Sequence, residues 1–281
     1  MSKIVESEYK YGVLLQFNGV NGSIYDAIEY AYVLNKIDKT RIIISNNSNY
    51  SEDEIKNIFL NLIKRKYILD DIPVDIIILK NNTTIHKIKY KALLFMNTDI
   101  ILKMYYFFAD KYIVLNDYFT ERFKKRIDIL KLPNVYTFNE MPYFPTPVNY
   151  KFKFAFDIYK KYDKLENNTL ISYKDFNGKY MHIMKLFSND TGEEIKFEEY
   201  PINDFHSKFN RYIYNNINFF DPRCRLVIEC FYYGIDLNNI IRNIKEENYD
   251  GAYHRLKDLR ENGLENRYLD INDEAIQVMI E

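Results

Sequence analysis

Residues 11–45 read YGVLLQFNGVNGSIYDAIEYAYVLNKIDKTRIIIS, and this stretch decides the fold. Its two ends, 11–17 and 41–45, are short apolar runs that are typical of buried strands. Between them, residues 24–36 repeat apolar side chains at helical spacing, and Ser23 is a suitable N-cap for that helix. A strand, a glycine-containing turn, a helix and a second strand predict the βαβ unit of a parallel sheet.

The same alternation continues through the rest of the N-terminal half. The second helix, predicted over 51–66, begins with Ser51 and Glu54, which form a capping-box pattern. The remaining elements predicted in this half are strands at 74–79, 91–96, 111–116 and 135–139 and helices at 100–109 and 118–127. Strands that alternate with helices are typical of a parallel sheet with helices on both faces.

Residues 141–147, MPYFPTP, interrupt this alternation with three prolines and predict a crossover between two domains. Beyond them, the predicted elements are strands at 170–173, 195–199 and 211–214, helices at 180–187, 223–233, 253–260 and 272–280, and a short strand or loop at 235–241. We therefore expect an α/β protein with two Rossmann-like domains, 1–145 and 146–281, that face each other across a cleft. Such clefts bind ligands at the carboxyl ends of the strands.

The composition limits the classes of partner. The 281 residues carry a formal net charge of -1, so no overall field attracts nucleic acid or an anionic membrane. The first residues, MSKIVESEYKYG, lack the layout of a signal peptide, and the apolar runs are too short to span a bilayer. These features predict a cytoplasmic protein without a transmembrane segment.

The stretch with the most chemical signals is 220–234, which reads FDPRCRLVIECFYYG. Asp221 and Pro222 are typical of a helix N-terminus, whose free N–H groups and positive dipole favour a phosphate. Arg223 and Arg225 add guanidinium groups, which pair well with phosphate oxygens. This segment therefore predicts a site for a phosphate-bearing ligand.

Glu229 follows two turns later among apolar residues, where a carboxylate is unfavourable unless it faces a cleft or a partner. A carboxylate can accept both hydroxyl protons of a ribose, so the segment fits a nucleotide-diphosphate donor. A plainer interpretation is open as well. Asp221 could be only a cap, and Arg225 and Glu229, at positions i and i+4, could form an ordinary helix salt bridge.

This segment resembles the donor-site helix of the GT-B glycosyltransferases. In that family an acidic residue, seven residues and then a Glu open this helix, and Asp221 and Glu229 have the same spacing, with Asp in place of the commoner first Glu. The turn at 232–235 is similar too, as is the tail, where 250–255 and 270–273 precede a final helix. The resemblance implies a GT-B architecture, a nucleotide-diphosphate sugar as donor, and a ribose-binding role for Glu229.

Two loops match further donor contacts of that family. GT-B enzymes place a basic pair after the first strand of the C-terminal domain to hold the diphosphate, and Lys174 and Lys179 match it, with Lys174 in place of the usual Arg. Gly19 and Gly22 follow the first strand of the chain and allow close approach of the backbone to the reacting sugar and diphosphate. Both loops could also be plain turns. The dinucleotide fingerprint GxGxxG is missing, which disfavours an NAD-type oxidoreductase.

Transfer to a hydroxyl can require a base that takes its proton. Asp26, Asp99 and Asp117 are the candidates in the N-terminal half, and we choose Asp99 and Asp26 as the catalytic residues. No Asp-x-Asp motif, CxxC pair or histidine cluster marks a metal site. We therefore expect no metal and no cofactor, with the nucleotide sugar as co-substrate, and we expect Cys224 and Cys230 to be reduced core residues.

The acceptor has two alternatives. The composition is typical of an AT-rich genome and, with the small size, resembles phage enzymes that glycosylate hydroxymethylated bases in DNA. Basic runs at 64–66 and 122–126 could line a groove for such DNA. A cell-surface glycan is the other acceptor. The alternative to an enzyme is a non-catalytic protein of the same fold that binds a nucleotide or a protein partner.

Overall fold

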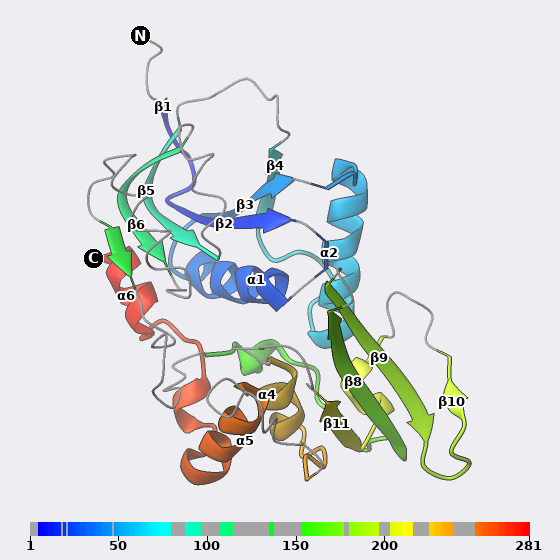
Figure 1. Ribbon diagram of the computed structural model, residues 1–281. Coiled ribbons are helices and arrows are strands. Elements are labelled where there is room, and N and C mark those ends of the chain that lie inside the picture. The colour runs from blue at the N-terminus through cyan, green and yellow to red at the C-terminus, as the bar shows by residue number, and fades with distance from the viewer. Residues whose placement is uncertain are drawn as a thin grey trace.

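A computed structural model shows an α/β protein with a larger parallel sheet and a smaller mixed sheet (Figure 1). The structure describes residues 5–17, 19–20, 22–46, 48–79, 88–96, 107–114, 135–137, 153–176, 180–196, 203–215, 225–238 and 251–281. The first half of the chain forms the larger sheet, and the second half forms the smaller sheet and most of the remaining helices. The α/β class that the sequence predicts is therefore confirmed.

The larger sheet has the strand order β4-β3-β2-β5-β6-β7. Its strands are β2 (Tyr11–Phe17), β3 (Thr40–Asn46), β4 (Asp75–Leu79), β5 (Ile88–Phe95), β6 (Phe107–Val114) and β7 (Val135–Thr137), and β1 (Val5–Glu6) also pairs with β5. The described pairs in this sheet are all parallel. The chain starts in the centre at β2, extends to one edge through β3 and β4, and returns to the other side at β5.

Side chains on the two faces of this sheet enter two different cores. On β2, Val13 and Leu15 belong to the main core, whereas Leu14 belongs to a second core on the opposite face. Ile43 on β3 joins Leu14, and its neighbour Ile44 joins the main core. This alternation follows from the two-residue period of a strand, and apolar side chains on both faces are typical of parallel sheets.

Three helices cover the main-core face: α1 (Gly22–Asn35), α2 (Glu52–Lys66) and α6 (Glu274–Ile280). The N-terminus of α2 has the predicted capping box, because Ser51 Oγ accepts from the N–H of Glu54 at 3.3 Å and Glu54 Oε2 accepts from the N–H of Ser51 at 2.6 Å. The predicted cap at Ser23 is wrong, because α1 already begins at Gly22. Ser23 therefore lies inside the first turn.

The last helix returns to the first half of the chain. Ala275 and Met279 of α6 are buried in the main core with residues of β5 and β6. Lys111 Nζ on β6 donates to the carbonyl of Val278 at 3.0 Å, and Lys91 Nζ on β5 donates to the carbonyl of Ile280. Two lysines therefore bind the carbonyls at the C-terminal end of α6, where the helix dipole favours positive charge.

The smaller sheet has the order β10-β9-β8-β11. Its strands are β8 (Asn168–Phe176), β9 (Tyr180–Ser188), β10 (Glu194–Ile195) and β11 (Arg211–Asn215). The pairs β8/β9 and β9/β10 are antiparallel, whereas β11 is parallel to β8. Among the described residues, the second half therefore does not repeat the parallel Rossmann-like arrangement that the sequence predicted.

Two helix predictions are wrong. Residues 180–187, predicted as a helix, form β9, which pairs with β8 along its whole length. The apolar residues of this segment fit the period of a helix as well as that of a strand. Pairing with β8 decides which of the two forms. Residues 107–109, predicted as the end of a helix, begin β6. The predicted helix at 118–127 and the proline-rich crossover at 141–147 lie outside the described residues.

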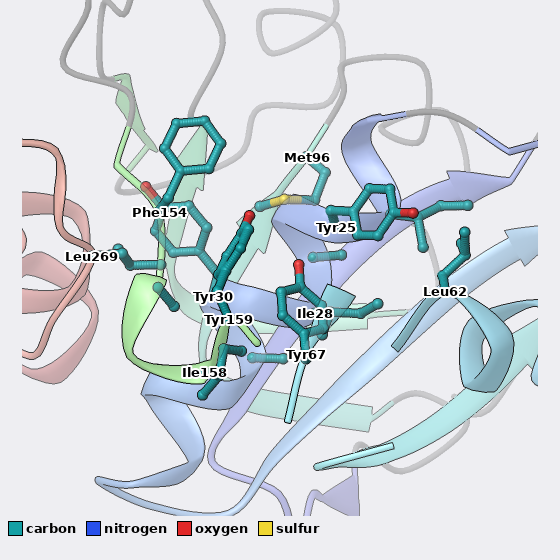
Figure 2. Packing of buried hydrophobic residues seen from close by; sticks show 14 of the residues in the cluster. Tyr25, Ile28, Tyr30, Leu62, Tyr67, Met96, Phe154, Ile158, Tyr159 and Leu269 are labelled. Carbon is teal, nitrogen blue, oxygen red and sulfur yellow. The ribbon is translucent and has the colours of Figure 1, made fainter. Parts of the chain in front are cut away.

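The remaining elements of the second half pack on the same main core. They are the helices α4 (Arg225–Tyr232) and α5 (Gly251–Asn262) and the 3₁₀ turns η2 (Phe156–Ile158), η3 (Phe205–Lys208) and η5 (Glu265–Arg267). Figure 2 shows side chains of both halves in one cluster, with Leu62 of α2 toward the right, Ile28 of α1 and Tyr159 in between, and Ile158 and Leu269 toward the left. One continuous core therefore joins the two halves of the chain.

Two smaller predictions concern cysteine and the membrane. Cys230 is a buried thiol that forms no disulfide with a described residue, and Cys224 lies outside the described residues. In the part of the chain that the structure describes, no helix has both the length and the apolar character needed to cross a membrane.

The packing around Gly12 gives a test of the fold. A Cβ at Gly12 would lie 2.6 Å from Leu93 Cδ2 and 2.9 Å from Ile43 Cδ1, in the second core. We expect Gly12→Ala to lower the free energy of unfolding by about 1–3 kcal/mol, because the buried strand has no room for a methyl group. Urea denaturation measures this change. Gly22→Ala is the control, since its Cβ meets no atom within 4 Å and stability should stay level or rise. Equal losses in both variants would contradict the packing described.

Candidate functional site

The carboxyl ends of β2 and β5 form the switch point of the larger sheet. Along the chain, β2 is followed by β3 and β4 on one side of the sheet, and β5 is followed by β6 and β7 on the other side. Ligands of open α/β sheets bind at such a point. The loop after β2 contains Gly19, whose φ of 124° lies in a region that favours glycine. Among the described residues, a Cβ added at Gly19 or Gly22 would meet no atom within 4 Å.

A group of charged side chains lies between α1, the end of α2, and α4. We call it the buried charge cluster. Its members are Asp26, Glu29, Lys66, His206, Arg225 and Glu229, together with the hydroxyl groups of Tyr67 and Tyr159. Each of these residues is at most 9% exposed. Because isolated buried charges are strongly unfavourable, the cluster must satisfy its own members.

Arg225, the first residue of α4, is the centre of this cluster. Its Nε donates to Glu229 Oε1 at 2.6 Å, within the same helix. Its Nη1 donates to Asp26 and its Nη2 to Glu29, both on α1. Nη2 also lies within hydrogen-bonding distance of the hydroxyls of Tyr159 and Tyr67. One guanidinium therefore binds carboxylates from two helices, which fixes the start of α4 against α1.

Glu229 is fully buried and both of its oxygens are bonded. Lys66 Nζ donates to Oε2 at 2.6 Å, and His206 Nε2 lies 3.0 Å from the same oxygen. Oε1 accepts from Arg225, and the Tyr159 hydroxyl lies 3.2 Å from the same oxygen. Burial alone would raise the pKa of Glu229, but Lys66, His206 and Arg225 outweigh burial and hold it well below its ordinary value. Glu229 is therefore ionised.

Glu29 links α1 to the segment that opens the second half. Its Oε1 accepts from the hydroxyls of Tyr67 at 2.6 Å and Tyr159 at 2.8 Å, and its Oε2 accepts from the N–H of Ala155 at 2.9 Å. Burial and then the charge of Glu229 raise the pKa of both tyrosines well above the ordinary value. Both hydroxyls therefore keep their protons and act as donors.

His206 is the neutral member of the cluster. Its ring is completely buried and stacks on Tyr233 at a centroid distance of 4.6 Å. Burial lowers the pKa of His206 to about 4, even though Glu229 favours the charged form. The neutral ring donates from Nε2 to Glu229, and Nδ1 then has no hydrogen-bond partner among the described residues. Among the described groups bonded within the cluster, Asp26, Glu29 and Glu229 therefore face two cations, Lys66 and Arg225, and Arg65 lies near enough to act on His206 from outside.

The structure brings together three of the residues predicted for the site. Asp26, Arg225 and Glu229 meet in the buried charge cluster, while Gly19 and Gly22 lie at the switch point. The helix salt bridge between Arg225 and Glu229, the plainer interpretation of that segment, is present. The donor role of both residues stays a prediction.

Other predicted site residues are placed differently or fall outside the described parts. Lys174 lies within β8 and not in the loop after a strand, because β8 extends to Phe176. Asp99, Lys179 and Arg223 lie outside the described residues.

Sequence reasoning missed the partners that α4 meets. Glu29 had a usable signal, because it is a carboxylate on the apolar face of a predicted helix, like Glu229. Lys66 stood in a run of three basic residues that looked solvent-exposed. His206 and Tyr159 carried no distinguishing pattern. Their roles depend on contacts with residues far away in the sequence.

The chain matches no protein-family model, no curated protein and no solved structure in our comparisons. Within the described ranges there is also no group of three or more His, Cys, Asp or Glu residues arranged to hold a metal ion. Functional assignment therefore depends on the geometry of the site.

The Lys66–Glu229 pair gives a test of the cluster. We expect Lys66→Met to lower the free energy of unfolding by about 3 kcal/mol, because the variant keeps the aliphatic stem but removes a buried counter-charge of Glu229. Chemical denaturation at pH 7 measures this. Lys64→Met is the matched control, since Lys64 is exposed on the same helix and should change stability by no more than about 0.5 kcal/mol. Similar small effects at both positions would contradict the role of Lys66.

His206 predicts a dependence of stability on pH. The unfolded chain binds a proton at the ordinary histidine pKa of 6.5, whereas folded His206 does so only near 4. Stability should therefore fall as the pH is lowered from about 6.5 to about 4, by roughly 3 kcal/mol from this group. We expect the free energy of unfolding, measured by urea denaturation, to change less with pH over this range in His206→Gln than in wild type. An unchanged slope in the variant would show that His206 is not buried in its neutral form.

Proposed function

We propose that this protein is a glycosyltransferase that binds a nucleotide-diphosphate sugar between the switch point of the larger sheet and the start of α4. The carrying observation is the contact of Arg225, the first residue of α4, with Asp26 in the second turn of α1. This contact brings the starts of two helices close to the carboxyl end of β2. Helix N-termini offer free N–H groups and a positive dipole, which favour a diphosphate.

The strand order of the larger sheet supports a nucleotide ligand. The order β4-β3-β2-β5-β6-β7 is that of nucleotide-binding α/β sheets, with the ligand at the β2/β5 switch point. Two features support the proposal of a GT-B arrangement. Residues 221–229 resemble the donor-site helix of that family, and α4 lies against this sheet. The mixed smaller sheet is a departure from that arrangement.

The chemistry proposed is displacement of the nucleotide diphosphate by an acceptor hydroxyl. The two helix starts would stabilise the negative charge that develops on the leaving diphosphate. Asp99, four residues after Phe95 at the end of β5, is the proposed base that takes the acceptor proton. Asp26 suits this role less well, because it is 4% exposed and bonded to Arg225.

The acceptor is proposed as a hydroxyl of a hydroxymethylated DNA base, with a glycan as the alternative. The basic run at 64–66 places less positive charge on the surface than its sequence indicates. Lys66 is buried against Glu229, and the Arg65 guanidinium lies 3.7 Å over the ring of Phe205, which leaves Lys64 exposed. The second basic run, 122–126, lies outside the described residues.

A second candidate is a non-catalytic nucleotide-binding protein. The observation that favours it is the engagement of Arg225 and Glu229 by other groups of the protein, which leaves neither free for a donor in the conformation described. Turnover separates the two candidates. Release of free nucleotide diphosphate with hydroxymethylated DNA or a glycan indicates an enzyme, and binding without release indicates the second candidate.

Thermal denaturation with a panel of nucleotide-diphosphate sugars, free nucleotides and NAD tests the donor site. A ligand at one hundred times its Kd stabilises the folded state by about 2.7 kcal/mol. We expect one nucleotide sugar to raise the Tm clearly. Gly19→Ala should weaken that shift, because a Cβ disfavours the positive φ that places this loop beside the ligand.

Gly192→Ala is the matched control. Gly192 also has a positive φ and open space for a Cβ, but it lies in the turn between β9 and β10. Its substitution also strains a position with positive φ, and it should leave the ligand-induced shift unchanged. No shift with any nucleotide sugar at millimolar concentration would sink the proposed function. If Gly19→Ala and Gly192→Ala reduced the ligand-induced Tm shift equally, the ligand would not bind at the switch point.

A further inference from the structure

The guanidinium of Arg225 faces two different kinds of partner. Its Nε side is bonded to Glu229 on its own helix, at 2.6 Å. Its Nη1 and Nη2 groups are bonded to two carboxylates on another helix, Asp26 and Glu29. Two neighbouring anionic groups on the two Nη atoms of one arginine are also what a diphosphate provides, because carboxylate and phosphate oxygens fit the same guanidinium geometry.

We propose that Arg225 is a binding site for a diphosphate-type anion, and that the carboxylates of Asp26 and Glu29 compete with that anion for it. Resting on the proposed function, this inference assigns α1 a self-inhibiting role at the donor site. Binding of the diphosphate releases Arg225 from α1, and the return of the two carboxylates expels the diphosphate.

The position of Arg225 within the cluster makes this exchange feasible. Arg225 is 9% exposed, whereas Asp26 is 4%, Glu29 is 1% and Glu229 is 0% exposed. It is therefore the member nearest to the surface, at the first residue of its helix. The bond to Glu229 stays within α4, so an anion can replace the α1 carboxylates without unwinding that helix.

The partners of Glu29 make its release from Arg225 tolerable. Its carboxylate also accepts from Tyr67, from Tyr159 and from the N–H of Ala155. These three donors stay in place when the guanidinium leaves, so Glu29 does not become an unsatisfied buried charge. For Glu29, the exchange therefore avoids the main cost of breaking a buried ion pair.

The charge of the cluster opposes an incoming anion. Among the groups bonded to one another, three carboxylates face the two cations Lys66 and Arg225, because the buried ring of His206 is neutral, and Arg65 acts on His206 only from outside the bonded group. Removing the charges of Asp26 and Glu29 makes the net charge of these bonded groups positive, since Glu229 alone then faces Lys66 and Arg225. A variant without these two charges should bind a diphosphate more tightly, whereas a purely structural role for them predicts equal or weaker binding.

Isothermal titration with inorganic pyrophosphate tests the competition. We compare wild type with Asp26→Asn/Glu29→Gln, which keeps the shape of both side chains. The control is Asp38→Asn/Glu166→Gln, which makes the same change in net charge at two exposed pairs, with Lys10 and Lys208. We expect pyrophosphate to bind the cluster variant about tenfold more tightly than wild type, because Arg225 gains free donors. The control should bind like wild type.

Several results would overturn the competition. Equal or weaker binding by the folded cluster variant would do so, as would an equal gain in the control or no binding by any protein. Adding Arg225→Lys to the cluster variant should abolish the gain, and a persistent gain would place the anion elsewhere. If circular dichroism shows that the double variant is unfolded, Asp26→Asn alone is tested, with a smaller gain expected and the same results counting against it.

The same proteins distinguish this inference from the proposed function. Tighter pyrophosphate binding by the cluster variant, without binding of any nucleotide sugar, would support the competition and reject the glycosyltransferase. Equal nucleotide-sugar and pyrophosphate binding by wild type and variant, with turnover, would support the enzyme and reject the competition.

Discussion

The bonding of Arg225 to Asp26, Glu29 and Glu229 is the interaction on which the arrangement of the two halves depends. Apolar packing alone tolerates small shifts between α1 and α4, because dispersion and burial are not directional. A buried guanidinium does not tolerate them, since each donor that loses its acceptor becomes an unsatisfied charged group. The cluster therefore specifies one relative position of these helices, and the surrounding aromatic core fills the space around that position.

The same residues connect stability with ligand binding. The α1 helix begins at the switch point and carries Asp26 and Glu29 within its first two turns. A ligand that moves Arg225 also moves the contacts that hold α1 against the second half of the chain. Binding and the relative position of the halves are then linked, because a ligand shifts a conformational equilibrium by its difference in affinity for the two states.

The sequence predicted the N-terminal half better than the C-terminal half for a physical reason. The strands β2 and β3 are apolar runs bounded by turn residues, and the capping box at Ser51 is a local signal that needs no distant partner. The strand at 180–188 has no such local signal, and its pairing with β8 decides its structure. The site divides in the same way. The pair Arg225 and Glu229 follows from helical spacing, whereas Lys66, His206 and Tyr159 join it only through the tertiary fold.

The position of α6 has a consequence for synthesis of the chain. Its residues complete the core beside β5 and β6, and Lys91 of β5 binds a carbonyl 189 positions farther along the sequence. A growing chain can pair the strands of the larger sheet early, but apolar surface on β5 and β6 stays uncovered until residues 274–280 have left the ribosome. Such late closure favours slow folding and exposes aggregation-prone surface in the meantime. We therefore expect chaperones that shield apolar surface to improve the folding yield of the nascent protein.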